Sequence, residues 1–309
     1  MSSFIQESRL SSIMARIPVF ANATRVSPVA GGLTNSNYRV DTPAQTYLLR
    51  VSDSTAGLLR ISRENELINT ERAHKAGVGA PVIDSLPDEN VLVIGWIEAK
   101  TLHAEDIRSQ TQLLPRFANS LKMLHSGPEF QGVLHFPSLR KRYLKLVQSA
   151  GYFLPDQYLS IEHLVLDLEK ALESDPEILV PCNNDLLAEN FMDDGKKIWI
   201  IDYEYSGQNE ASFEIGNFAG EISLSDEQLT DLCNAYWQKH IPSKIARAMA
   251  WSMIARYGWV LWASIQEAIS SINFDFRSWG MVKWDSVLPE FHGNRYQKVI
   301  NILKKSFHE

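Results

Sequence analysis

Alternating apolar and polar residues in the first hundred positions predict a set of short β-strands. The apolar runs are separated by clusters of Gly, Pro, Asn, Asp and Ser, which favour turns. The predicted strands are residues 26–30, 38–40, 46–51, 80–83 and 91–94. Because Pro28 has no backbone N–H, we expect the first strand to lie at an edge of a sheet or to begin there.

Two helical segments accompany these strands. Residues 1–20 predict a short amphipathic lead-in, whose packing residues are Ile13, Ile17 and Val19. Residues 62–76 predict a helix with acidic residues in its first turns and Gly77 as its terminator. The residues expected to face inward from this helix are Leu67, Ile68 and Ala73.

From residue 99 onward the pattern is mainly helical. Apolar residues recur at helical spacing in residues 113–124, and further helices are predicted at 138–151 and 161–173. The sequence therefore predicts an α+β protein with two parts. The first is a small strand-rich part, residues 1–98, and the second is a larger, mainly helical part, residues 99–309.

A β-hairpin is predicted at residues 191–201. Asp193-Asp194-Gly195 is a strong turn signal, and the residues after it return as an apolar strand. A hairpin brings the residue before its first strand, Asn190, beside the residue after its second strand, Asp202. Because paired positions on neighbouring strands lie within roughly 6 Å of each other, these two side chains could share one cation.

The chemistry of these residues suits a magnesium ion and a phosphate ester. The amide oxygen of Asn190 and the carboxylate of Asp202 are hard oxygen ligands, which Mg²⁺ binds while it keeps waters and substrate phosphates. Asp185 lies five residues upstream of Asn190 and is separate from the metal pair. It is therefore free to accept a proton.

Composition narrows the classes of function and location. The chain of 309 residues is 45% hydrophobic and 22% charged, as in ordinary globular proteins. Its net charge is −7 and no basic run reaches five residues, so nucleic acid is not expected as a partner. The first residues lack a signal-peptide pattern and no apolar run approaches about 20 residues, so we expect no membrane span and a cytoplasmic location. The oligomeric state stays open, with a homodimer as one arrangement.

Two cysteines, Cys182 and Cys233, support neither a disulfide framework nor a metal cluster. Cys182 adjoins the loop that carries Asp185 and is expected to be a packing residue rather than a nucleophile. His125 ends a predicted helix and is expected to be structural.

The order Asp-x4-Asn followed by a strand that ends in Asp resembles the kinase-like phosphotransferases. The segments NNDLLAEN (residues 183–190) and IDYEYSGQNEASFEIGN (residues 201–217) more closely resemble the choline/ethanolamine kinase family. The similarity extends from Gly31 to about Trp284. It implies a bilobal protein-kinase-like fold and transfer of the γ-phosphate of Mg-ATP to the hydroxyl of a small cationic alcohol, with Asp185 as the catalytic base.

The resemblance also implies residues that bind ATP. The glycine- and asparagine-rich stretch at residues 31–37 resembles the nucleotide loop of choline kinases, and Arg50 stands where kinases place their phosphate-binding lysine. Glu66 is implied as the partner of Arg50, with Glu64 as the alternative. Residues 95–98 resemble the interlobe hinge, whose backbone binds adenine. The residues implied to contact ATP are Gly31, Gly32, Thr34, Asn35, Ser36, Asn37, Arg50, Glu66, Gly95 and Ile97.

An aromatic-rich carboxyl third suggests how the alcohol is recognised. Trp259 and Trp262 are three residues apart on a predicted helix and share a face. YGWVLWASIQ (residues 257–266) resembles the choline kinase segment, which implies that these two residues, together with Phe276 and Trp279, surround the substrate. A quaternary ammonium cannot donate hydrogen bonds, so aromatic faces and a carboxylate are what recognise it. The candidate carboxylates are Glu204 and Glu221.

Two departures from the family pattern keep alternatives open. Asn183 stands where members usually have histidine, and we expect slower catalysis at worst. An ATP-binding pseudokinase or regulator is the non-enzymatic alternative, against which the retained Asp185, Asn190 and Asp202 count. Phe276 and Trp279 replace the usual tyrosines, and the loss of hydroxyls can change substrate choice. The other enzymatic alternative is a kinase of thiamine, an aminoglycoside or an amino sugar, although the tryptophan-rich end argues against aminoglycosides. Choline and ethanolamine are not distinguished by the sequence.

Overall fold

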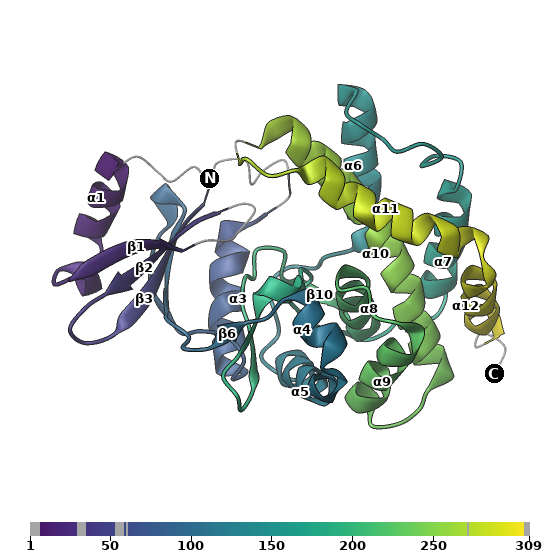
Figure 1. The fold of residues 1–309 in the computed structure, drawn as a ribbon, viewed down its shortest axis with the longest axis horizontal. Helices are drawn as coiled ribbons and strands as arrows, with labels where there is room; N and C mark the ends of the chain where they lie inside the picture. Colours follow the sequence, from purple (N-terminus) through teal and green to yellow (C-terminus); the bar gives the residue numbers. More distant parts are fainter. Residues whose placement is uncertain (1–6, 30–34, 53–58, 60, 271, 306–309) are drawn as a thin grey trace.

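The computed structural model describes residues 7–29, 35–52, 59, 61–270 and 272–305. A five-stranded antiparallel sheet lies at one end of the molecule and a mainly helical region at the other (Figure 1). The predicted α+β class, with a strand-rich first part and a mainly helical second part, is confirmed. Gly31, Gly32 and Thr34, which were predicted to contact ATP, lie outside the described residues.

The sheet has the strand order β1-β2-β3-β5-β4. Its strands are β1 (Arg25–Val29), β2 (Asn35–Asp41), β3 (Thr46–Ser52), β4 (Val82–Leu86) and β5 (Val91–Gly95). β1 lies at the edge, as Pro28 predicted. Asn35, Ser36 and Asn37 belong to β2 and not to the preceding loop, because they pair with Ser52, Val51 and Arg50 of β3. The backbone hydrogen bonds of that ladder outweigh the turn preference of asparagine.

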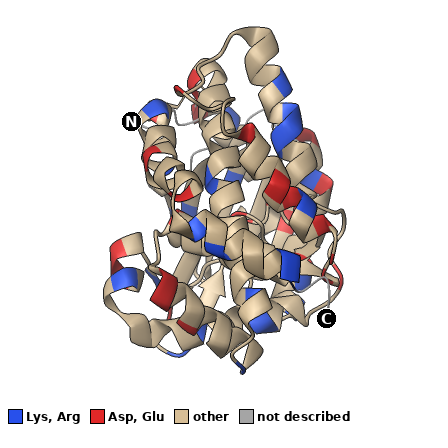
Figure 2. Ribbon diagram, turned by 90° about the vertical axis from the view of Figure 1, so that its right-hand side faces the viewer, with Lys and Arg blue, Asp and Glu red and all other residues tan. Residues whose placement is uncertain are grey.

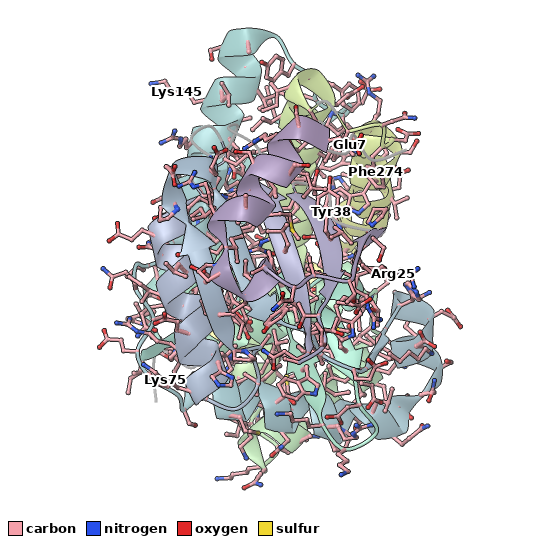
Figure 3. All side chains as sticks on the ribbon, turned by 90° about the vertical axis from the view of Figure 1, so that its left-hand side faces the viewer. Glu7, Arg25, Tyr38, Lys75, Lys145 and Phe274 are labelled. Atoms are coloured by element: carbon pink, nitrogen blue, oxygen red, sulfur yellow. The ribbon has the colours of Figure 1, made fainter. Side chains whose placement is uncertain are left out.

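The two faces of the sheet have different roles. Leu49 and Val51 of β3 point to one face, where the apolar residues of α1 (Glu7–Arg16) cover them. Figure 3 shows α1 lying across this face. Side chains alternate along a strand, so Arg50 points to the opposite face, toward α3 (Arg63–Lys75).

The buried face of α3 is polar, contrary to the expectation that Leu67 and Ile68 point inward. Its buried residues are Glu66, Asn69, Thr70 and Ala73, whereas Leu67 and Ile68 are half-buried. The reason is hydrogen bonding. The amide of Asn69 donates to the carbonyl oxygens of Gln131 and Ser206 and accepts the N–H of Gln131, which ties α3 to the second part of the chain.

A long helix, α10 (Pro242–Ile269), forms the centre of the helical region. It packs against α8 (Ala211–Glu221), where Gly216 approaches so closely that an added Cβ would lie 2.3 Å from the carbonyl oxygen of Ala248. The other helices are α4 (Ala104–Ser109), α5 (Leu114–His125), α6 (Phe136–Ala150), α7 (Glu162–Glu173), α9 (Asp226–Trp237), α11 (Phe276–His292) and α12 (Asn294–Lys305). The predicted helices at 113–124, 138–151 and 161–173 are therefore confirmed to within two residues.

The predicted hairpin is present. β8 (Phe191–Asp193) pairs antiparallel with β9 (Ile198–Ile200), and β6 (Lys100–Thr101) adds a third strand. Asp194 caps the turn by accepting the N–H groups of Lys196 and Lys197, each at 2.8 Å. Beside it, β7 (Leu179–Cys182) pairs with β10 (Gly207–Glu210), and the loop between β7 and β8 carries Asp185.

Basic and acidic residues are interspersed over the helices seen in Figure 2. Among the described residues, no helix combines the length and the apolar character that a membrane crossing requires.

Candidate active site

The loop that follows β7 is held in place by a buried carboxylate. Glu214, on α8, accepts the backbone N–H of Asn183 at one oxygen and that of Asn184 at the other, both at 3.0 Å. The amide of Asn184 donates to the carbonyl oxygen of Tyr205, and Asn217 donates to the carbonyl oxygen of Asn184. These bonds support Asn184 in a left-handed conformation with φ of 67°, which asparagine tolerates better than most residues.

Asn183 connects this loop to the end of the hairpin. Its Oδ1 accepts the N–H of Asp185 at 3.0 Å, and its Nδ2 donates to the carbonyl oxygens of Ile201 at 3.2 Å and Asp202 at 2.7 Å. The residue is completely buried. One amide side chain therefore fixes the backbone of Asp185 and the backbone of Asp202 relative to each other.

The carboxylate of Asp185 is a suitable proton acceptor. Within the part of the chain that the structure describes, no hydrogen bond or ion pair engages its oxygens. Desolvation raises the pKa of the Asp185 carboxyl well above its usual range, and the nearby charges of Glu204, Asp202 and Glu221 raise it further. A carboxylate with a raised pKa is a stronger base than an ordinary aspartate.

Asn190 and Asp202 lie at the two open ends of the hairpin, as predicted, and the N–H of Ile201 donates to the carbonyl oxygen of Asn190 at 2.9 Å. The Nδ2 of Asn190 donates to the carbonyl oxygen of Asp185 at 2.6 Å, which leaves Oδ1 as its ligand atom. Asp202 has a positive φ of 62° and offers a carboxylate. An amide oxygen and a carboxylate oxygen at this place fit the ligand preference of Mg²⁺.

Arg50 links the sheet to this site. Its guanidinium forms ion pairs with Glu66 of α3 and, at 2.7 Å, with Asp202. The implied Arg50–Glu66 pair is thus present, and Glu66, not Glu64, is the partner. Arg63 completes the cluster, because it contacts Glu66 at 2.7 Å and Glu204 at 3.3 Å. Sequence reasoning did not single out Arg63, since a charged residue in the first turn of a helix carries no signal of its own.

Glu204 faces the sheet and a cavity. The Nδ2 of Asn35 donates to its carboxylate at 3.4 Å, so Asn35 of β2 and Glu204 of the loop after β9 are neighbours. A cavity of about 700 Å³ opens beside Glu204, lined also by Tyr205, residues 61, 62 and 65 near the start of α3, and residues 138, 139 and 142 of α6.

Residues 95–98, predicted to form the hinge, lie at the end of β5 and directly after it. The N–H of Gly95 donates to the carbonyl oxygen of Pro81 and that of Trp96 to Thr46, so neither is available to a ligand. Ile97 lies beyond the strand ladder and is half-buried. Of the two predicted adenine contacts, Gly95 thus has its N–H engaged within the protein, and binding of adenine by the backbone of Ile97 stays a prediction.

The predicted aromatic residues are brought together. The ring centroid of Trp262 lies 5.8 Å from that of Phe276 and 5.3 Å from that of Trp279. Tyr205 joins them, because its hydroxyl accepts the indole N–H of Trp262 at 2.9 Å and its ring lies 5.6 Å from that of Trp259. The indole N–H of Trp259 donates to Asn217 at 2.8 Å.

Glu221, the second predicted carboxylate, has a partner that the sequence did not suggest. The Nζ of Lys283 on α11 donates to Glu221 at 2.5 Å and lies 3.8 Å from the centre of the Trp279 ring. Lys283 is 62 positions from Glu221 in the chain, so no local pattern connects them.

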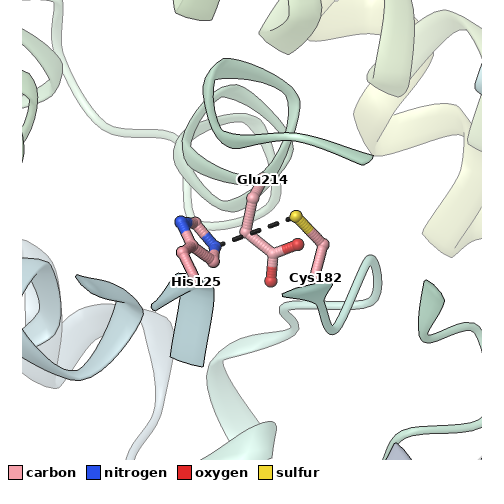
Figure 4. Close-up of side chains that lie close together, drawn as sticks. All are labelled: His125, Cys182 and Glu214. Atoms are coloured by element: carbon pink, nitrogen blue, oxygen red, sulfur yellow. Dashed lines mark hydrogen bonds between the residues drawn. The ribbon is translucent and has the colours of Figure 1, made fainter. Parts of the chain in front are cut away.

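Behind the loop, His125, Cys182 and Glu214 form a buried cluster (Figure 4), whose ligand atoms all lie within 4.8 Å of one another. Burial lowers the pKa of His125 to about 3 and raises that of Glu214 to about 7. Burial also raises the pKa of the Cys182 thiol, which argues against a nucleophile. Because Glu214 already accepts two backbone N–H groups and Nδ1 of His125 is bonded to the Tyr236 hydroxyl, the cluster supports the loop.

Comparison with known proteins gives this geometry a family context. The model of the choline/ethanolamine kinase family matches residues 26–244. Protein LicA of Haemophilus influenzae is 27% identical over 248 residues, covering 77% of this chain and 72% of LicA. Ethanolamine kinase 2 of Rattus norvegicus is 27% identical over 269 residues, covering 77% and 68%. A solved choline/ethanolamine kinase family protein from Mesorhizobium loti superimposes with a TM-score of 0.85 at 26% identity, covering 96% of this chain and 99% of the other.

Proposed function

The chain belongs to the choline/ethanolamine kinase family, and from this premise we propose that it transfers the γ-phosphate of ATP to the hydroxyl of choline or ethanolamine. The observation that carries the proposal is the linkage made by Asn183, which fixes Asp185 relative to Asp202. A proton acceptor and a metal ligand are thereby held in one buried frame, as phosphoryl transfer requires.

In the proposed mechanism, Asp185 accepts the proton of the substrate hydroxyl and orients that oxygen for in-line attack on the γ-phosphorus. Burial raises the pKa of Asp185, the charges of Glu204, Asp202 and Glu221 raise it further, and both effects strengthen it as a base. The Asn183 amide holds its backbone by accepting the N–H of Asp185.

Asn190 and Asp202 are proposed to hold magnesium, which would neutralise phosphate charge when bound. The hydrogen bond from Nδ2 of Asn190 to Asp185 orients the amide, so that its Oδ1 is the available ligand. Arg50 is proposed to bind phosphate oxygens of ATP, held in position by Glu66. Asn35, Ser36 and Asn37 on β2, together with Gly31, Gly32 and Thr34, are proposed to cover the phosphates, and the backbone of Ile97 to bind adenine.

The aromatic group of Trp259, Trp262, Phe276 and Trp279 is proposed to recognise the cationic end of the alcohol. Its members meet around Trp262 and Tyr205. The pseudokinase alternative rested on Asn183 in place of the usual histidine. The three hydrogen bonds of Asn183 support an intact catalytic loop, so we favour an active enzyme. A cytoplasmic location and a homodimer stay predictions from the sequence.

The test is ADP release with Mg-ATP and a panel of choline, ethanolamine, thiamine and kanamycin. The proposal expects turnover with choline or ethanolamine, and none above background with the other two. Turnover with thiamine or kanamycin alone would contradict the proposed substrate class and keep the phosphotransferase. No turnover with any alcohol, in a protein that still binds ATP, would contradict the activity itself.

A further inference from the structure

The ammonium group of Lys283 lies between a carboxylate and an aromatic ring, the two groups that would also bind the ammonium of a substrate. Its Nζ lies 2.5 Å from a carboxylate oxygen of Glu221 and 3.8 Å from the centre of the Trp279 ring. The side chains of Lys283 and Glu221 are only 7% and 6% exposed. A carboxylate and an aromatic face, shielded from water, are the two groups that bind an alkylammonium most strongly.

Lys283 lies close to the reacting groups. Its positive charge lowers the pKa of Asp185, while the negative charge of Glu221 raises it, so both act on the proposed base. A cavity of about 240 Å³ is lined by Glu221, Trp279 and Lys283, together with residues 187–189, which follow Asp185 on the same loop.

The other carboxylates around Asp185 also have protein cations as partners. Glu204 contacts Arg63 at 3.3 Å, and Asp202 contacts Arg50 at 2.7 Å. Each of Glu204, Asp202 and Glu221 therefore contacts a protein cation. Arg50 and Arg63 also share Glu66, so among these contacts of the described residues the Lys283–Glu221 pair is the one that joins a single cation to a single carboxylate. Within the described residues, the carboxylate of Asp185 differs from these three in having no hydrogen bond or ion pair, and it is needed for the hydroxyl.

This distribution of charge distinguishes two kinds of ammonium. A primary ammonium has three N–H donors, and burying them without acceptors is costly. A quaternary ammonium has no N–H, so aromatic faces and a nearby negative charge suffice and no hydrogen-bond acceptor has to be left free for it. The indole N–H groups of Trp259 and Trp262 are bonded to Asn217 and Tyr205, so these donors are already used within the protein.

We propose that Lys283 is a specificity-determining residue that makes the site select a quaternary ammonium alcohol over a primary one, because it saturates Glu221. This inference rests on the proposed kinase function and goes further, since it chooses between choline and ethanolamine. Lys283 acts by occupying the carboxylate that a primary ammonium would otherwise use.

The experiment compares kcat/KM for choline and for ethanolamine in the wild type and in Lys283→Met, which keeps an unbranched side chain, one atom shorter, and removes its charge. We expect the wild type to favour choline by at least tenfold. In Lys283→Met the free Glu221 carboxylate can accept the N–H groups of ethanolamine, so the preference should fall by at least tenfold through a lower KM for ethanolamine.

Two further variants separate selectivity from damage to the fold. Lys283→Arg keeps the ion pair and should keep the wild-type preference. The double variant Glu221→Gln with Lys283→Met has no carboxylate to offer, so it too should keep the preference for choline. Thermal unfolding gives an independent readout, because ethanolamine should raise the melting temperature of Lys283→Met more than that of the wild type.

The outcomes are distinct. A wild type that prefers ethanolamine, or a folded Lys283→Met protein with an unchanged ratio and no added stabilisation by ethanolamine, would overturn the role of Lys283 and leave the kinase function standing. No turnover of either alcohol by the wild type would instead overturn the proposed function, and with it the role of Lys283.

Discussion

Replacing Asn183 by alanine tests whether one buried amide holds the proposed base and the proposed metal ligand together. The change removes three hydrogen bonds, from the N–H of Asp185 and to the carbonyl oxygens of Ile201 and Asp202. Each buried bond contributes about 1 kcal/mol net, so the free energy of unfolding should fall by about 3 kcal/mol. The side chain is completely buried, which limits compensation by solvent.

The catalytic effect should be larger than the stability effect implies. Without the amide, the backbones at Asp185 and Asp202 lose their common support, and a misplacement of about 1 Å in reacting groups costs about 100-fold in rate. We therefore expect kcat to fall by about 100-fold in Asn183→Ala, while KM for ATP stays within threefold. Steady-state ADP release and urea unfolding measure the two quantities.

Two variants sharpen this test. Asn183→Asp keeps an oxygen for the N–H of Asp185 but faces two carbonyl oxygens with a carboxylate, so it should be at least as impaired as Asn183→Ala. Asn119→Ala, at an exposed position on α5, is the matched control and should change stability by less than about 0.5 kcal/mol. Asn183→Ala with normal kcat and normal stability would refute the reasoning.

Three further predictions follow from the same geometry. Because the pKa of Asp185 is raised in the folded protein, ionisation of Asp185 opposes folding at pH values above its unfolded pKa of about 4. The melting temperature of Asp185→Asn should therefore exceed that of the wild type, by a margin that widens from pH 4 to pH 8. A margin that narrows over this range would contradict the assignment. Arg50→Met should raise KM for ATP by about tenfold or more and leave KM for the alcohol within threefold, because Arg50 is proposed to contact phosphate and not the alcohol. Both constants are measured by ADP release, and equal effects on the two would argue against that role. Gly216→Ala should lower the free energy of unfolding, measured in urea, by about 3 kcal/mol, because its Cβ would lie 2.3 Å from the carbonyl oxygen of Ala248. Gly151→Ala should lower it by about 1 kcal/mol, because Gly151 has open space around it and only a positive φ of 67°. Similar losses in the two variants would contradict the close contact of α8 and α10.

The sequence was most informative where contacts are local. A hairpin fixes which residues meet at its open end, so the spacing of Asn190, Asp202 and the turn between them predicted their arrangement. The edge position of β1 was also predictable, because Pro28 has no backbone N–H to donate to a neighbouring strand and proline is therefore found on edge strands. The Arg50–Glu66 pair and the aromatic group came from family resemblance rather than from periodicity.

The contacts that the sequence did not predict join distant segments. Arg63 meets Glu204 across 141 positions, and Lys283 meets Glu221 across 62. No periodic pattern contains such pairs, and a charged residue of this kind is, by itself, typical of a solvent-facing position. The buried polar face of α3 was missed because hydrophobic periodicity assumes an apolar core, whereas Glu66 and Asn69 are buried by partners on other elements.

The most direct test of the central claim is choline-dependent ADP release by Asp185→Ala, measured beside ATP binding by the same protein. The account predicts that turnover falls by about 100-fold or more, as expected when a general base is removed, while the dissociation constant for Mg-ATP stays within threefold of the wild type. Near-normal turnover in Asp185→Ala would contradict the assignment of Asp185 as the base that accepts the proton of the alcohol.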